Sequence, residues 1–483
     1  MKGFISHRNF NMTVRILFIA TISILIASCK ERVTEKKPNI IYIMADDLGI
    51  GDLGCYGQEI IKTPNLDKLA EEGIRFTQHY AGNTVCAPSR CALMTGKHMG
   101  HAEVRGNKQA PNHGQWPITN ETVTVAELLK TAGYRTAMIG KWGLGNQDTP
   151  GAPLKQGFDY YFGYLDQVLA HNYYPEYLLR NDEKVVLDNK VFYLPEDHWT
   201  RGLGGYAENK VEYSHDLFTT DALQYIEENQ DQPFFLYIPY TIPHNNGEAL
   251  ENEKQEVPDF GLYENEDWPK ERKGYAAMIS RMDRDIGIIM KKLSDLEMLE
   301  NTLVIFTSDN GPMPDVEFTE YFNSNTNYRG GKRFLYEGGI RVPMIASWKG
   351  RTPAGSQSDH ISAFWDFLPT VCEVTGIPIP DYIDGISFLP SLLDRKDQQK
   401  LHDYLYWEFP EKGYSVAARK GKWKAIRTNM NDEPEKPLEL YNLDLDPEES
   451  QNIAENYPEI VSMMKEILRD AHTRSDNFPM PGE

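Results

Sequence analysis

Residues 39–45 (NIIYIMA) form a continuous apolar run, rich in β-branched side chains, that ends abruptly at Asp46 and Asp47. An apolar run without alternation is typical of a parallel strand that is buried on both faces of its sheet. Parallel strands need crossover connections, which are usually helices. This run therefore predicts an α/β fold, in which later segments supply the other strands and the helices.

Three further apolar runs follow the same plan, each ending in polar side chains. They are residues 135–140 before Lys141, residues 233–239 before His244, and residues 303–307 before Asp309 and Asn310. Helices are predicted between the runs, at residues 64–74, 122–133, 216–228 and 267–296. This alternation predicts a mainly parallel sheet with helices on both faces. Because ligands bind beyond the carboxyl ends of such strands, four polar ends on one edge predict a functional site there.

Length and a late change of pattern indicate two domains. The chain has 483 residues, which is too long for a single hydrophobic core. From about residue 385 the sequence predicts a hairpin over 414–428, a short strand over 438–443 and a helix over 457–472. We therefore expect a large α/β domain at 38–384 and a small α+β domain with an antiparallel sheet at 385–483.

The first 28 residues have the composition of a targeting segment. Positive charges precede an apolar run at 16–27, which is too short to span a bilayer. Residues 26–29 (IASC) resemble a bacterial lipobox, which implies cleavage before Cys29, a lipid on its sulfur and anchoring to a membrane. An ordinary cleaved signal peptide is the alternative. We expect an exported bacterial lipoprotein in the periplasm or on the outer-membrane surface, with 29–37 as a charged tether.

The charge balance excludes one class of partner. Lys and Arg total 50 and Asp and Glu total 71, which gives a formal net charge of −21. Nucleic-acid binding needs a basic face, so we expect no nucleic-acid partner. An anionic small substrate is still compatible with this charge, because a local basic pocket can exist on an acidic protein.

The five cysteines do not form a disulfide framework, although a Cys55–Cys91 pair is left open. Cys86 stands out, because residues 86–90 (CAPSR) predict a loop that turns into a short helix. Pro88 suits the first helical position. Cys86 would then lie just before the helix, where free N–H groups and the helix dipole favour negative charge. This stretch alone fits either a reactive cysteine or a small buried one in a capping loop.

The two aspartates that follow the first strand also allow two interpretations. Asp46 and Asp47 would repel each other and raise each other's pKa unless a cation lies between them. A surface turn, for which Asp is a common residue, is the other interpretation. The loop at 98–107 carries polar residues that can contact a substrate or belong to an ordinary loop. The segment at 151–205, for which the sequence predicts no structure, is a candidate substrate-binding wall. Their candidate substrate-binding residues are His101, Arg105, Asn107, His171 and Asn172.

From residue 38 to the last helix, the chain resembles the type I (arylsulfatase-like) sulfatases of the alkaline-phosphatase-like superfamily. The stretch at 86–90, followed by 93–96 (LMTG), matches the signature of that family. Residues 442–447 (NLDLDP) resemble its C-terminal signature. The resemblance implies an alkaline-phosphatase-like large domain, with a mainly parallel mixed sheet between helices, and a small C-terminal α+β domain. It also implies that a formylglycine-generating enzyme oxidises Cys86 to formylglycine.

The resemblance implies a metal site and a set of catalytic residues. Asp46, Asp47, Asp309 and Asn310 match the family's calcium ligands, with the modified Cys86 as nucleophile and fifth ligand. Three carboxylates and an amide are a hard-oxygen set, which suits Ca²⁺ better than zinc. Arg90 would hold the hydrated formylglycine, Lys141 and Lys332 would bind sulfate oxygens, and His244 would protonate the departing alcohol. One hydroxyl of the hydrated aldehyde can attack sulfur, and the other can expel sulfate as the aldehyde re-forms.

Two positions depart from the family pattern. Gly143 stands where Gly-Lys-Trp-His-Leu-Gly commonly has its histidine, and Met313 stands where a histidine often follows Asp-Asn-Gly-Pro. We expect another group, or water, to take the place of the first histidine. The leading hypothesis is a calcium-dependent sulfatase that acts on a sulfated carbohydrate. A phosphonate monoester or phosphodiester hydrolase of the same superfamily, and a non-catalytic glycan-binding relative, are the alternatives.

Overall fold

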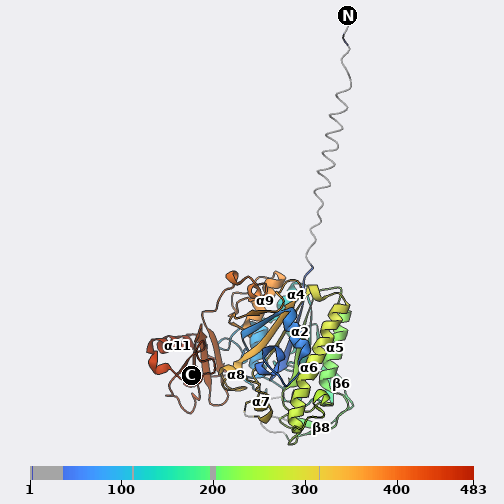
Figure 1. The fold of residues 1–483 in the computed structure, drawn as a ribbon, viewed down its shortest axis with the longest axis horizontal. Helices are drawn as coiled ribbons and strands as arrows, with labels where there is room; N and C mark the ends of the chain where they lie inside the picture. The colour runs from blue at the N-terminus through green and yellow to red at the C-terminus, as the bar shows by residue number, and fades with distance from the viewer. Residues whose placement is uncertain (1–2, 4–35, 111–113, 196–202, 315) are drawn as a thin grey trace. The chain divides into compact units, whose positions relative to one another are not determined.

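The structure is a computed structural model that describes residue 3 and residues 36–110, 114–195, 203–314 and 316–483. The predicted signal segment at 1–28, Cys29 and most of the predicted tether lie outside the described residues, apart from residue 3. The chain separates into two units, residues 1–37 and residues 38–483 (Figure 1). All that follows concerns the second unit. Among the described residues, no helix has both the length and the apolar character needed to cross a membrane.

Among the described residues, eleven strands form one large sheet. Its order is β12-β2-β11-β10-β1-β9-β3-β4-β5-β6, and β13 pairs with β2. The strands are β1 (Asn39–Asp46), β2 (Ile74–Tyr80), β3 (Arg135–Lys141), β4 (Tyr160–Tyr164), β5 (Tyr177–Arg180), β6 (Glu183–Val186), β9 (Phe234–Pro243), β10 (Thr302–Ser308), β11 (Arg341–Trp348), β12 (Ser356–Ser358) and β13 (Ser362–Ala363). The four strands recognised from apolar runs ending in polar residues, β10, β1, β9 and β3, are adjacent and parallel at its centre. This confirms the predicted parallel sheet.

Antiparallel strands lie at the margins of the sheet, as expected for a mainly parallel mixed sheet. β11 runs antiparallel to β10, and β2 runs antiparallel to β11. We had assigned Ile74 to the helix before it, whereas it begins β2. In β2 buried and partly exposed side chains are mixed, so the strand lacks the continuous apolar run that marks the central ones. β4, β5 and β6 occupy the segment at 151–205 for which the sequence predicted no structure.

Helices cover both faces of the large sheet, as predicted. Along β1, Ile40, Tyr42 and Met44 face one core and Ile41, Ile43 and Ala45 face the other. The first core includes side chains of α3 (Cys86–Thr95), α4 (Val125–Thr131) and α9 (Phe367–Thr375). The second includes side chains of α2 (Pro64–Glu72), α5 (Ser214–Glu228) and α6 (Lys270–Asp295). Figure 1 shows α5 and α6 side by side and α4 next to α9.

A second, antiparallel sheet lies in the C-terminal part, with the order β14-β15-β16-β17. Its strands are β14 (Leu405–Phe409), β15 (Ser415–Lys420), β16 (Trp423–Arg427) and β17 (Glu439–Asn442). α11 (Pro458–Asp470) packs on one face of this sheet, whereas Trp407, Ile426 and Tyr441 join the core of the large sheet. The hairpin, strand and helix predicted here are confirmed, while the boundary between residues 384 and 385 stays a prediction.

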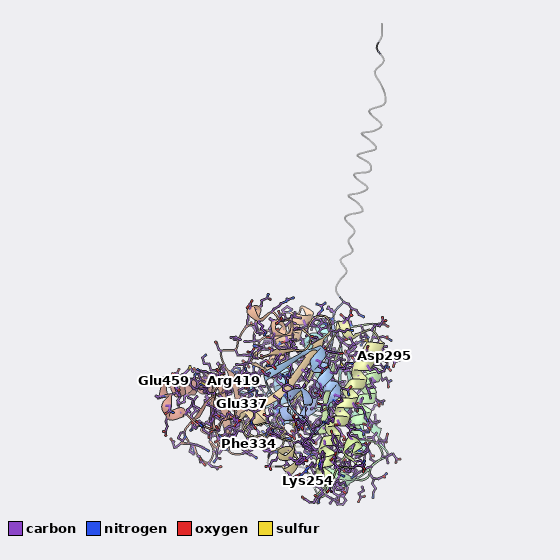
Figure 2. The ribbon with its side chains drawn as sticks, viewed as in Figure 1. Lys254, Asp295, Phe334, Glu337, Arg419 and Glu459 are labelled. Carbon is purple, nitrogen blue, oxygen red and sulfur yellow. The ribbon has the colours of Figure 1, made fainter. Side chains whose placement is uncertain are left out.

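Buried ion pairs fix the C-terminal sheet to the rest of the unit. Lys424 Nζ on β16 lies 2.8 Å from a carboxylate oxygen of Glu337 and 2.8 Å from one of Glu449. Figure 2 labels Glu337 and Arg419 in this region. The remaining elements are α7 (Glu317–Tyr321), α8 (Glu337–Ile340), α10 (Leu389–Leu392) and a two-stranded sheet of β7 (Lys190–Tyr193) and β8 (Gly205–Asn209).

Candidate active site

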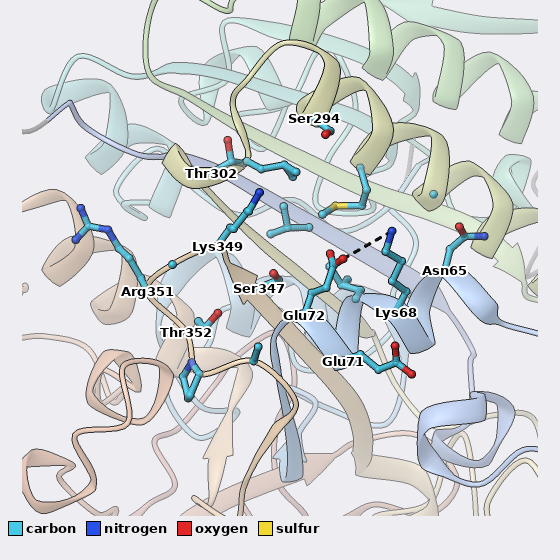
Figure 3. A pocket seen from close by; sticks show the side chains of 18 of the residues that line it. Asn65, Lys68, Glu71, Glu72, Ser294, Thr302, Ser347, Lys349, Arg351 and Thr352 are labelled. Carbon is cyan, nitrogen blue, oxygen red and sulfur yellow. Dashed lines mark ion pairs between the residues drawn. The ribbon is translucent and has the colours of Figure 1, made fainter.

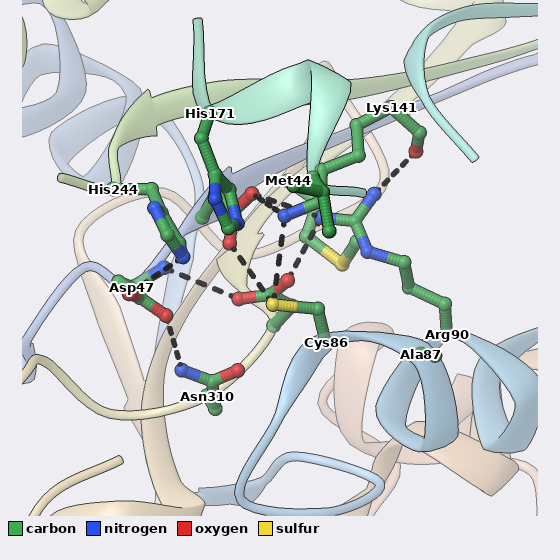
Figure 4. A network of polar contacts seen from close by, with 12 residues as sticks. Met44, Asp47, Cys86, Ala87, Arg90, Lys141, His171, His244 and Asn310 are labelled. Atoms are coloured by element: carbon green, nitrogen blue, oxygen red, sulfur yellow. Dashed lines mark hydrogen bonds and ion pairs between the residues drawn. The ribbon is translucent and has the colours of Figure 1, made fainter. Parts of the chain in front are cut away.

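The polar residues at the four central strand ends lie together beside Cys86 (Figure 4). Asp46 ends β1 and Lys141 ends β3, while His244 follows the last residue of β9. Asp309 and Asn310 follow β10 directly. Because these strands are parallel neighbours, their carboxyl ends share one edge of the sheet. This arrangement confirms the prediction that one edge carries a convergent cluster of polar side chains.

Cys86 is the first residue of α3, so the helix begins two residues earlier than Pro88 suggested. Ser89, in the first turn, fixes this helix to the end of β10. Its hydroxyl donates to the carbonyl oxygen of Asp309 at 2.5 Å and accepts the N–H of Gly82 at 3.0 Å. The Cys86 side chain therefore has a fixed position, and only 2% of the residue is exposed.

Both a carboxylate and two ammonium groups surround the Cys86 sulfur. Sγ lies 3.3 Å from Oδ1 of Asp46, 3.6 Å from Nζ of Lys141 and 3.8 Å from Nζ of Lys332. Burial, together with the charge of Asp46, raises the pKa of the thiol above its usual value despite both lysines. An unmodified Cys86 is therefore a protonated thiol at neutral pH, and a thiol is a weaker nucleophile than a thiolate. The described cysteines, Cys55 and Cys91 included, form no disulfide.

Charged partners surround each of the buried carboxylates. Lys141 Nζ lies 2.5 Å from Asp46 Oδ2, and Arg90 Nη2 lies 2.8 Å from Asp309 Oδ2. Burial alone would raise the pKa of Asp46, but the charges of Lys141 and Arg90 bring it below its usual range. For Asp309, burial and the nearby charge of Asp46 outweigh Arg90 and raise the pKa to about 7. The concentration of acidic groups is thus a local electrostatic cost that a bound cation would relieve.

Asn310 supplies the observation that favours a cation among these oxygens. Its Nδ2 donates to Asp47 Oδ1 at 2.7 Å and to the carbonyl oxygen of Gly311 at 2.9 Å. Its Oδ1 is buried without a hydrogen-bond partner in the described part of the chain. Such an oxygen beside three carboxylates belongs to a donor set that fits a hard divalent cation. Asp46, Asp47, Cys86 and His244 also have ligand atoms close enough together to share one ion.

His244 and Lys332 form a pair that can hold a proton for transfer. Lys332 Nζ lies 2.9 Å from His244 Nε2, and Nδ1 of His244 lies 2.6 Å from the carbonyl oxygen of Asn245. A carbonyl only accepts, so Nδ1 carries the ring proton and Nε2 accepts from the lysine. Burial and the charge of Lys332 lower the pKa of His244 well below its usual value. His171 stacks on His244 with ring centroids 4.5 Å apart.

Comparisons of the sequence with known proteins assign the chain to one family. The sulfatase family model covers residues 38–377, and that of the C-terminal region of N-sulphoglucosamine sulphohydrolase covers 329–474. The chain belongs to the sulfatase family. An N-acetylgalactosamine-6-O-sulfatase of Bacteroides thetaiotaomicron is 31% identical to this sulfatase over 531 residues, covering 93% of this chain and 97% of its own length. The activity of this chain is therefore that of a sulfuric ester hydrolase.

Solved structures support the same assignment. A Bacteroides thetaiotaomicron protein from work on glycosaminoglycan metabolism superposes with a TM-score of 0.73 at 28% identity, covering 91% of this sulfatase and 100% of that chain. A second structure, solved in complex with a neocarrahexaose, has a TM-score of 0.72 at 26% identity, covering 90% of this sulfatase and 93% of that chain. The predicted alkaline-phosphatase-like fold is thereby confirmed.

A cavity of about 210 Å³ lies beside Cys86 of the sulfatase. Its lining includes Cys86, His244 and Lys332, and also two of the substrate-binding candidates, Asn107 and His171. Asn107 connects the cavity to two other segments. Its Oδ1 accepts the N–H of Ala87 at 3.2 Å, and its own N–H donates to Glu411 Oε1 at 2.8 Å. Substrate contact by Asn107 and His171 stays a prediction.

The other three candidates do not line this cavity, and each has at least one polar group that contacts another part of the protein. His101 Nδ1 lies 2.9 Å from Asp384, and Arg105 Nη1 donates to Glu408 Oε1 at 2.7 Å. Asn172 Oδ1 accepts the N–H of Tyr174 at 3.0 Å. In the sequence, the two candidates that line the cavity and the three that do not are all polar residues of Gly-containing segments. Only the folded structure distinguishes the residues that line the cavity from the others.

Arg90 acts on the carboxylates and the backbone of the site. Besides Asp309, its Nη2 lies 3.6 Å from Asp46 Oδ2, and its Nη1 donates to the carbonyl oxygen of Lys141. Its Nε is buried without a hydrogen-bond partner among the described residues. The side chain thus ties the ends of β1, β3 and β10 together, while contact with a hydrated formylglycine stays a prediction.

A larger cavity, of about 1030 Å³, lies away from the strand ends that carry the site (Figure 3). Its lining includes Thr302, at the start of β10, and the segment that follows β11. Lys68 and Glu72 form an ion pair there at 3.7 Å. Cys86 and the strand-end residues of the candidate site do not line it, so volume alone does not mark the functional cavity of this sulfatase.

Proposed function

We propose that this sulfatase depends on calcium, uses a formylglycine made from Cys86, and removes sulfate from a sulfated carbohydrate. The observation that carries the proposal is the arrangement around the Cys86 sulfur, where Asp46, Lys141 and Lys332 all lie within 4 Å. A carboxylate favours a cation next to the nucleophile, and two ammonium groups favour an anionic reacting group.

The oxygens of Asp46, Asp47, Asp309 and Asn310 would hold the calcium ion, and the partnerless Oδ1 of Asn310 supports this assignment. A bound dication lowers the pKa of an adjacent hydroxyl and stabilises negative charge on sulfate oxygens. The oxidised side chain at position 86 supplies an aldehyde whose hydrate has two hydroxyls on one carbon. A formylglycine-generating enzyme must provide the oxidant for that change.

The chain's own cations would do the rest of the electrostatic work. Lys141 and Lys332 would donate to sulfate oxygens and stabilise the charge that develops as the ester bond breaks. The proton between Lys332 and His244 lies on the cavity wall, where the leaving oxygen of a bound ester would need it. His244 would first take this proton from Lys332 at Nε2 and then transfer it to the leaving oxygen, which turns a poor alkoxide leaving group into an alcohol and leaves Lys332 neutral until it regains a proton from water.

Replacement of the nucleophile tests the mechanism. We expect Cys86→Ala to lower kcat/KM for an aryl sulfate on the order of 10³-fold or more, as loss of a nucleophile does in other hydrolases. Cys91→Ala, which changes a buried cysteine in the same helix, is the control and should keep most of the activity. Peptide mass spectrometry of active wild-type protein should show an aldehyde at position 86. An unmodified thiol in fully active enzyme would contradict the proposal.

Metal removal and alternative esters test the remaining parts. Chelation should abolish turnover and added Ca²⁺ should restore it, whereas persistent activity in a chelator would exclude the metal role.

Faster turnover of an aryl phosphodiester than of an aryl sulfate would favour the alternative hydrolase. Binding of a sulfated saccharide without sulfate release would favour a glycan-binding protein.

The substrate class and the location rest on separate observations. The relatives' names and a bound neocarrahexaose point to sugars, so we propose a sulfated saccharide. Desulfation across a panel of sulfated saccharides would identify the substrate, and activity on aryl sulfates alone would contradict the proposal.

The IASC sequence at 26–29 supports an exported lipoprotein anchored through Cys29. Labelling with a palmitate analogue tests this, and an unlabelled mature protein would refute it.

A further inference from the structure

Gly143 makes room for one side chain in the wall of the candidate site. Beyond the end of β3, the N–H groups of Trp142 and Gly143 donate to the carbonyl oxygens of Tyr164 and Leu165, at 2.8 and 3.2 Å. This extends the pairing of β3 with β4 and brings the segment after β4 alongside Gly143. A β-carbon at position 143 would lie only 2.6 Å from Nε2 of Gln167, and the φ of 87° at Gly143 is one that glycine tolerates best.

Gln167 is a buried polar side chain with an unused donor. It is 4% exposed and lines the same cavity as Cys86, His171 and Lys332. Its Nε2 is buried and has no hydrogen-bond partner in the described part of the chain. A buried donor without a partner destabilises the folded protein, so a ligand that accepts its hydrogen bond is the physical reason to keep it.

Charge and position define the ligand group that suits this donor. Gly143 lies two residues after Lys141, whose ammonium group is 3.6 Å from the Cys86 sulfur. A third cation beside Lys141 and Lys332 would add like-charge repulsion, whereas a neutral carboxamide adds a donor without charge. An anionic oxygen is the acceptor that these three groups together favour.

We propose that Gln167 is a substrate-binding residue whose carboxamide Nε2 donates a hydrogen bond to an oxygen of the sulfate group held above Cys86. The inference deepens the proposed sulfatase mechanism and rests on it. This role of Gln167 requires glycine at position 143, because any larger residue there would displace the Gln167 amide. Position 167 thus takes up the space that a side chain at position 143 would otherwise occupy.

Two substitutions of similar shape separate binding from simple space filling. Gln167→Met removes the donor and keeps the length of the side chain, and Gln167→Glu places a negative charge toward the sulfate. We expect kcat/KM for 4-nitrophenyl sulfate to fall about ten- to a hundredfold in the first variant, the size expected for a hydrogen bond to a charged group. The second variant should lose more. Gln224→Met, on the exposed side of α5, is the control and should match wild type.

A binding measurement decides the inference without turnover. Inorganic sulfate is titrated by calorimetry into Cys86→Ser protein with and without Gln167→Met, and melting temperatures are compared. We expect sulfate affinity to fall by a similar factor while the melting temperature stays the same or rises. Sulfate affinity within twofold of the parent, or no sulfate binding by the parent, would overturn the inference. If wild type hydrolyses no sulfate ester, the proposed function fails, but the titration still decides the role of Gln167.

Discussion

At the scale of single residues, the site combines groups that would repel or attract each other strongly in isolation. Asp46, Asp47 and Asp309 are fully buried acids, and Arg90, Lys141 and Lys332 are buried cations that pair with them. Removing charged side chains from water costs free energy, and charges buried in this way are kept where they serve a charged ligand or a reaction. The pairs position the ammonium groups next to the Cys86 sulfur before any substrate arrives.

His244 is the residue whose loss should depend on the substrate. An aryl sulfate has a good leaving group and needs little help from an acid, whereas a sugar alkoxide needs a proton. We expect His244→Gln to lower kcat/KM on the order of 10²–10⁴-fold for a sulfated saccharide and much less for 4-nitrophenyl sulfate. Steady-state kinetics on both esters check this.

His101→Gln is the matched control for that experiment, because His101 is paired with Asp384 outside the cavity. It should leave both substrates close to wild-type rates. Equal losses on both esters in His244→Gln would show that His244 binds the sulfate instead of protonating the leaving group.

At the scale of elements, two neighbouring residues of α3 connect the helix to the end of β10. Arg90 pairs with the Asp309 carboxylate, and the Ser89 hydroxyl donates to the Asp309 carbonyl oxygen. Ser89→Ala would leave the N–H of Gly82 and the carbonyl oxygen of Asp309 without this partner in a buried place. We expect the free energy of unfolding to fall by about 1–3 kcal/mol, measured by urea denaturation.

Thr95→Val offers a comparison within the same helix. The Thr95 hydroxyl donates only to the carbonyl oxygen of Cys91, one turn earlier in α3, so its loss removes no contact between elements. Its effect should be clearly smaller than that of Ser89→Ala. Similar stabilities for Ser89→Ala and wild type would show that other contacts hold α3 in place.

The central elements could be predicted from the sequence because their signals are local. β1, β9 and β10 are continuous apolar runs, and their last residues identify the site edge. β5 and β6 are four-residue strands with exposed positions, which give no such signal. The direction of β11 depends on its pairing with β10, which the sequence of either strand does not specify. Gln167 was missed for a similar reason, since only the folded chain brings it beside Gly143.

At the scale of the whole unit at 38–483, the C-terminal sheet contributes to the same core as the large sheet. His472 connects the C-terminal sheet to Glu483. Its Nδ1 lies 2.7 Å from Glu408 on β14, and its Nε2 lies 3.0 Å from Glu483. The hydrogen bond to Glu408 is the main cause that raises the pKa of His472 above its usual value.

This pKa shift predicts a pH dependence of stability. A histidine whose pKa is raised by folding stabilises the protein fully below its unfolded pKa of about 6.5, and this stabilisation is lost as pH rises through the folded pKa. We expect the melting temperature of wild type to fall more between about pH 6 and pH 9 than that of His472→Gln. Other groups titrate in both proteins, so the difference between the two curves isolates His472. Parallel curves would contradict the assignment.

Asn107 joins the C-terminal region to the candidate site. The carboxylate of Glu411, in the turn after β14, accepts the Asn107 N–H, and the Asn107 side chain accepts the N–H of Ala87 beside Cys86. Two hydrogen bonds thus join a turn of the small sheet to the residue next to Cys86. Exchanging this sheet with that of a relative would therefore alter the alignment of the reacting group as well as the outer surface. Chimeric sulfatases built on this chain need to keep residues 107 and 411 as a pair.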